Sequence, residues 1–120
     1  MTKSIRTLFI ISTLGFATSA FACDYPDNVK VANGATATKD EMIASQSAVK
    51  KYVADMETYL ECIVEEEKSA RALIPDLEAQ QAQEREEMLN KKYNAAVEQM
   101  EKVAADFNSE VQIYKARDNT

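Results

Sequence analysis

This sequence of 120 residues contains no histidine and no tryptophan, and only two glycines, two prolines and two cysteines. Without histidine, the chain cannot build the Ser-His or Cys-His pairs that activate the nucleophile in many hydrolases. The glycines, Gly15 and Gly34, lie too far apart to form a glycine-rich phosphate loop. The usual zinc sites need histidine or further cysteines. We therefore expect a protein that is not an enzyme and that binds no cofactor or metal.

Basic residues are outnumbered by acidic residues, 14 to 20, so the net charge is −6 at neutral pH. An acidic surface repels phosphate backbones and anionic lipid headgroups, which argues against nucleic acid as a partner and against electrostatic docking on membranes. The carboxylates do not follow the spacing of an EF-hand loop. On a helix, Glu65-Glu66-Glu67 would point in three directions, and Glu84, Glu87 and Glu98 would form a solvated face.

The N-terminus has the three zones of a secretory signal peptide. Lys3 and Arg6 form a basic zone, residues 8–16 form an uncharged apolar zone, and Ala20-Phe21-Ala22 has the small-x-small form that signal peptidase accepts. The alternative, a membrane anchor, would need about 20 apolar residues. We expect cleavage after Ala22, which removes two positive charges and leaves 98 residues of net charge −8 in the periplasm or outside the cell, without a transmembrane segment.

The two cysteines, Cys23 and Cys62, both belong to the expected mature chain, and in an oxidising compartment they predict one disulfide. If a helix begins at Thr38, Cys62 lies about 36 Å along it. The preceding arm reaches up to about 50 Å when extended, so it can run back along the helix. Three alternatives stay open: a bond between two chains, a redox-active pair, and a lipid on Cys23. For the lipid, Ala20 and Phe21 match the lipoprotein signal poorly.

An irregular arm and then a clear helix start are expected after the signal peptide. Residues 23–37 contain Pro26 and the turn signal Asn33-Gly34, which disfavour a helix. Thr38 followed three residues later by Glu41 forms a capping box, which predicts the start of the first helix. The arm either packs on this helix or is a disordered leader tethered by the disulfide.

Apolar residues recur at steps of three and four in two stretches, which predicts two long amphipathic helices. Ser45 and Gln46 interrupt the first stripe. The first stripe contains Met42, Val49, Tyr52, Val53, Met56, Tyr59, Leu60 and Ile63, and the second contains Leu89, Tyr93, Ala96, Met100, Val103, Phe107, Val111 and Tyr114.

A fold back near Pro75 would pair residues whose numbers sum to about 150, so that apolar positions meet apolar positions. We therefore predict an all-α fold: an antiparallel two-helix coiled-coil hairpin over residues 38–117, with its turn at 73–77 and a frayed tail at 118–120. Pro75 suits the first turn of the second helix. The expected pairs are Met42 with Phe107, Val49 with Met100, Met56 with Tyr93, and Leu60 or Ile63 with Leu89.

Two other arrangements compete with an isolated hairpin. The first is one continuous kinked helix of about 75 residues, about 110 Å long, that pairs with other chains. The phase of the two stripes does not exclude it. The second is a homodimer in which two hairpins form a four-helix bundle, since one hairpin buries a small core.

The stretch from Cys23 to Cys62, about a third of the chain, resembles a type of small, exported, uncharacterised helical (coiled-coil) protein of proteobacteria. The resemblance rests on Cys23, Pro26-Asp27, residues 33–38, Glu41-Met42 and residues 59–62. It implies export, helical structure and the disulfide, and it supplies no functional residues. Together with the patterns above, it leads us to expect an exported structural or interaction protein that binds a protein partner or a second copy of itself. The alternatives are a periplasmic holdase-type chaperone and an envelope component that is lipid-anchored through Cys23.

Overall fold

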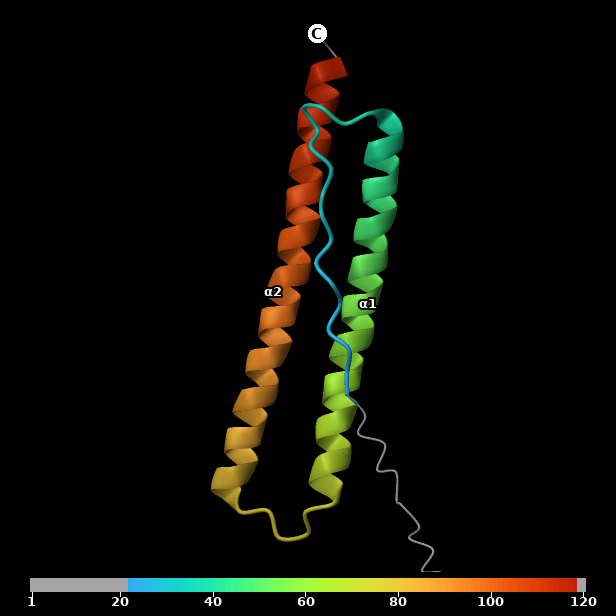
Figure 1. Cartoon of the computed structure of the whole chain (residues 1–120). Helices are drawn as coiled ribbons and strands as arrows, with labels where there is room; N and C mark the ends of the chain where they lie inside the picture. The colour runs from blue at the N-terminus through green and yellow to red at the C-terminus, as the bar shows by residue number, and fades with distance from the viewer. Residues whose placement is uncertain (1–21, 119–120) are drawn as a thin grey trace, which may run out of the picture.

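The protein folds as a hairpin of two long antiparallel helices, and an extended N-terminal arm lies along one side of the pair (Figure 1). The computed structural model describes residues 22–118, and these contain no strand. Helix α1 spans Lys39–Ala72 and helix α2 spans Ala79–Asp118. Their 34 and 40 residues give lengths of about 50 and 60 Å. The predicted all-α hairpin is confirmed, and the continuous helix is excluded.

Helix α1 begins where the capping box predicts. The Thr38 hydroxyl accepts a hydrogen bond from the backbone N–H of Glu41 at 3.2 Å, and the Glu41 carboxylate accepts one from the N–H of Thr38 at 2.7 Å. These two bonds satisfy N–H groups that have no partner within the helix. The bond from the Thr38 backbone also lowers the pKa of the Glu41 carboxyl.

The connection between the helices covers residues 73–78, and here one prediction was wrong. Pro75 lies in a turn of this connection, not in the first turn of α2, which begins four residues later. Proline disfavours α geometry at the residue before it, so the chain leaves the helix before Ile74. The chain then has to cross to the neighbouring helix axis before the next helix can start. The backbone N–H of Ala82 bonds to the carbonyl of Glu78 at 2.9 Å as α2 begins.

The core is a single row of side chains along the seam between the helices. Met56 is completely buried near the middle of this row. Of the nine stripe residues expected to pair, six are buried, Leu89 and Met100 are partly buried, and Tyr93 is 39% exposed. No residue of α2 before Ala96 is buried. Besides Gly34 of the arm, the buried residues are Ala37, Met42, Ser45, Val49, Tyr52, Met56, Leu60, Ile63, Ala96, Val103 and Phe107.

The arm runs back along α1 and ends at the disulfide between Cys23 and Cys62, whose Cα atoms are 5.7 Å apart. This confirms the intrachain pairing and a packed arm. The Tyr25 ring meets the Tyr59 ring edge-on, with 5.0 Å between the ring centroids. The hydroxyl of Ser45 accepts a hydrogen bond from the backbone N–H of Ala32 at 3.0 Å. Ser45, which interrupts the apolar stripe, is therefore buried and binds the arm.

The turn at Asn33 fixes the other end of the arm against α2. The Asn33 carbonyl accepts backbone bonds from two later residues of the turn, and the N–H of Gly34 donates to the Glu110 carboxylate at 2.6 Å. The Arg117 guanidinium donates to the carbonyl oxygens of Ala35 and Ala37, at 3.0 and 2.7 Å. The predicted turn is confirmed, and the arm is held at both ends.

Glycine is required at position 34 because the backbone of α2 lies directly against it. A Cβ atom at this position would overlap the carbonyl oxygen of Glu110. We expect Gly34→Ala to lower the free energy of unfolding by about 1–3 kcal/mol, because the arm must shift away from α2. Urea unfolding followed by circular dichroism measures this change. Ala35→Ser, at an exposed position of the same turn, is the control. Equal midpoints for Gly34→Ala and the unchanged protein would contradict the close approach.

Candidate functional site

The connection end of the hairpin, residues 63–92, lies beyond the end of the arm, and an ionic cluster joins its two helices. The Glu67 carboxylate accepts hydrogen bonds from Nε of Arg71 at 2.9 Å and from Nε and Nη2 of Arg85 at 2.9 and 3.0 Å. Arg71 also donates to the carbonyl oxygen of Ala82 at 3.0 Å. The numbers of Glu67 and Arg85 sum to 152, and those of Arg71 and Ala82 sum to 153. Both sums are close to the value of about 150 predicted for paired residues of the hairpin.

Glu67 differs from the other glutamates of its charge run because it turns inward, and its side chain is only 17% exposed. Burial acts to raise the pKa of this carboxyl, but the hydrogen bonds from Arg85 and Arg71 outweigh it and hold the pKa below the ordinary value of 4.5. Because the folded protein binds this proton more weakly than the unfolded chain does, the cluster stabilises the fold above pH 4.5. The stabilisation is lost as the pH falls through the lowered pKa.

Replacing Glu67 with glutamine is expected to lower the free energy of unfolding by about 1–2 kcal/mol at neutral pH, because the three charge-assisted bonds from Arg71 and Arg85 are weakened or lost. The difference between Glu67→Gln and the unchanged protein should shrink as the pH falls below 4.5. Urea unfolding across a pH series measures it. Glu66→Gln, at the exposed neighbouring position, controls for the loss of charge. A difference that is the same in acid and at neutral pH would refute the ionic role of Glu67.

Exposed apolar side chains also gather towards the connection end. Among residues 22–118, eight large apolar side chains are more than a third exposed, and five of them lie between positions 64 and 93. Contacts between this end and a partner would remove that apolar area from water, which favours association. The five are Val64, Leu73, Ile74, Met88 and Tyr93.

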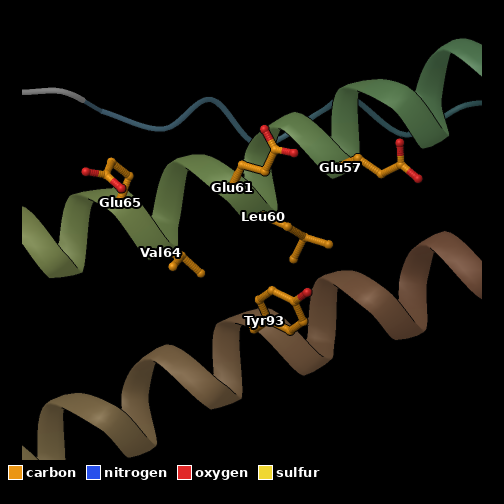
Figure 2. A pocket seen from close by; sticks show the side chains of 6 residues that line it. All are labelled: Glu57, Leu60, Glu61, Val64, Glu65 and Tyr93. Carbon is orange, nitrogen blue, oxygen red and sulfur yellow. The ribbon is translucent and has the colours of Figure 1, made fainter.

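Two of these side chains, Val64 and Tyr93, line a groove of about 470 Å³ between α1 and α2, which we call the acidic groove. Figure 2 shows Leu60 and Val64 of α1 directed towards Tyr93 of α2, while the glutamates follow α1. A spacing of four residues places those glutamates on one side of the helix. The acidic groove is lined by Leu60, Val64 and Tyr93 and by Glu57, Glu61 and Glu65.

The acidic groove opens on the side of the helix pair that the arm leaves uncovered. Tyr59 packs against Tyr25 of the arm. Glu61 follows Tyr59 by two residues, so the two side chains leave α1 about 200° apart. With only two helices and one arm, one side of the seam stays open to solvent. This explains why Tyr93, predicted to pair with Met56 in the core, instead lines the groove.

The charge at the groove is negative and largely unbalanced. Within the part of the chain that the structure describes, Glu57 and Glu61 form no ion pair, and Glu65 contacts Lys68 at 3.7 Å with both side chains exposed. The carboxylates are strung along one helix and do not converge, and residues 22–118 contain no cluster of three or more side chains suited to a metal ion. The groove therefore presents a row of carboxylates beside a strip of apolar side chains.

Sequence reasoning found the disulfide and most of the core but missed the groove. The signal was present, because Glu57, Glu61 and Glu65 recur every four residues beside Val64. In residues 22–118, neither helix has an apolar stretch long enough to cross a bilayer. Comparison with family models, curated proteins and solved structures found no match to this chain.

Proposed function

We propose that this chain is an exported, non-enzymatic interaction protein of the periplasm or cell exterior, which holds a protein partner on one side of its hairpin. The observation that carries the proposal is the acidic groove, in which Val64 and Tyr93 are 42% and 39% exposed. The groove lies on a scaffold held by the disulfide, the arm and the Glu67 cluster. Such a scaffold presents the groove in a fixed shape, which lowers the entropy lost on binding.

Two observations support export. A structural disulfide persists in oxidising compartments and is rare in the cytosol, and Cys23 is bonded to Cys62. The basic zone, apolar zone and cleavage motif of residues 1–22 lead to the same compartment, although all but Ala22 lie outside the described residues. A lipid on Cys23 would need the same sulfur atom that forms the disulfide, so the bonded state does not favour the lipid-anchored alternative.

The test has two parts, carried out on the full chain with its own leader in a Gram-negative host. Intact mass of the protein released by osmotic shock should match a chain that starts at Cys23 and carries one disulfide. A photo-crosslinking amino acid at Val64 should then capture a discrete partner, whereas one at exposed Lys50 should not. Free thiols on a chain that retains its leader, or equal crosslinking at both positions, would refute the proposal.

The apolar end of the hairpin favours a second candidate, the holdase-type chaperone. Leu73 is 83% exposed and Met88 is 62% exposed, and flexible methionine side chains adapt to varied apolar segments. A holdase should suppress the aggregation of a model client when present in excess. Replacing Leu73 and Met88 with glutamine should abolish that effect. No suppression by the unchanged protein would discard this candidate.

A further inference from the structure

We infer that the acidic groove docks a cationic amphipathic helix of a protein partner. The inference rests on the proposed interaction function and adds the chemistry of the partner. Leu60, Val64 and Tyr93 receive the apolar side chains of the partner helix, and lysine or arginine side chains beside them pair with the three glutamates.

The spacing of the glutamates matches a helix. Glu57, Glu61 and Glu65 follow one another at intervals of about 6 Å along α1, since each residue rises 1.5 Å. Basic residues four apart on a neighbouring helix repeat at the same interval. A helix laid along the seam would pack between α1 and α2 as helices pack in a bundle, where two helices leave a continuous groove for a third.

Binding needs the apolar floor of the groove, formed by Leu60, Val64 and Tyr93, as well as the charges of the glutamates. Exposed ion pairs contribute little to affinity, because water and salt screen them. Burying Val64 and Tyr93, which are both more than a third exposed, supplies the favourable free energy. The carboxylates then select a basic partner over an acidic one and speed its approach. The groove is lined by only six residues, so the interface is small, and we expect a dissociation constant in roughly the micromolar range.

Charge decides between this partner and a second copy of the chain. Two acidic grooves that faced each other would bring Glu57, Glu61 and Glu65 against their own counterparts. Each chain also carries a net charge of −6 before any leader is removed. Like charges brought together across an interface cost several kcal/mol, whereas a basic helix gains from the same field. The surface therefore fits a cationic partner better than it fits itself.

The binding test uses the disulfide-bonded chain from Cys23 onward and a labelled synthetic peptide of about 18 residues. In this peptide, leucines at steps of three and four form one face of a helix, and lysines fill the other positions. Fluorescence anisotropy should give saturable binding that weakens with salt. A peptide with glutamate in place of lysine should not bind. A peptide that keeps its lysines but has glutamine in place of leucine should bind at least about tenfold more weakly.

Variants of the protein locate the binding. Val64→Gln with Tyr93→Gln should weaken binding at least about tenfold, and both positions are exposed enough for the fold to survive, which circular dichroism checks. A triple variant with glutamine at the three groove glutamates should weaken it less, by about threefold to tenfold, and flatten the salt dependence. The matched control removes the same charge at three exposed sites outside the groove, Glu78, Glu98 and Glu101, and should bind normally.

Several results would overturn the inference. Equal weakening by the groove triple and the control triple would mean that only net charge attracts the peptide. If the peptide with glutamine in place of leucine bound as tightly as the leucine peptide, the apolar floor of the groove would not contribute to binding. A dimer that disappears in the Val64→Gln variant would make a second copy the occupant. If crosslinking at Val64 captures a partner whose contacting segment is not a basic helix, this inference fails while the interaction function stands.

Discussion

Replacing Cys23 and Cys62 together with serine is expected to lower the free energy of unfolding by about 4 kcal/mol. The bond joins positions 39 residues apart, so it removes much of the conformational entropy of the unfolded chain. Its loss also releases the end of the arm that lies beside Tyr59. A two-helix hairpin has a small core, so this single bond contributes a large share of the stability.

Urea unfolding without reductant measures this effect, and the unchanged protein in reductant should show the same midpoint as the double variant. Amide hydrogen exchange gives a local readout. In the folded double variant, protection at the N–H of Ala32 should fall, because the arm loses its covalent attachment. The N–H of Gly34, bonded to Glu110 near the opposite end of the arm, should stay protected longer. A double variant as stable as the unchanged protein would mean that packing alone holds the arm.

Met56→Ala should be the most destabilising single substitution in the seam, with a loss of about 2–5 kcal/mol. Met56 is 0% exposed and is the largest fully buried side chain among residues 22–118. Shortening it removes apolar contacts and leaves a cavity between the two helices that the long rod has few ways to close. Thermal or urea unfolding of the disulfide-bonded protein gives the change in stability.

Met88→Ala is the matched control, because Met88 is 62% exposed and the same atoms are removed. Its effect should stay within about 0.5 kcal/mol. Similar losses at positions 56 and 88 would show that the stripe does not form a packed seam along the hairpin. A larger loss at Met56, together with unchanged peptide binding, would separate the core of the fold from the proposed docking surface.

The features that were predictable from sequence depend on neighbours in the chain. The capping box at Thr38 and Glu41 needs only three residues of spacing, and the apolar period identified Met42, Val49 and Met56 as buried. The symmetry of the two stripes about Pro75 gave the hairpin and its register, to within three residue numbers. Local rules placed Pro75 itself wrongly, because the length of the crossing between two helix axes is a property of the packed pair.

The features that were missed depend on where the arm lies. Helical period places Tyr93 towards the seam but does not say which side of the seam the arm covers. The same uncertainty hid the role of Ser45, which is a gap in an apolar stripe until a backbone N–H from Ala32 reaches it. Glu67 is indistinguishable in sequence from Glu65 and Glu66, and its inward turn depends on Arg85 of the other helix.

The side-on entry of the arm has a practical consequence for any attachment to this molecule. Cys23 is fixed beside Cys62, so whatever is fused ahead of it leaves the rod from its flank, more than halfway along α1. A label or resin joined there would crowd the seam near the middle. Attachment after Asp118 would instead sit at the tip beside the start of α1 and leave the connection end, with Leu73, free.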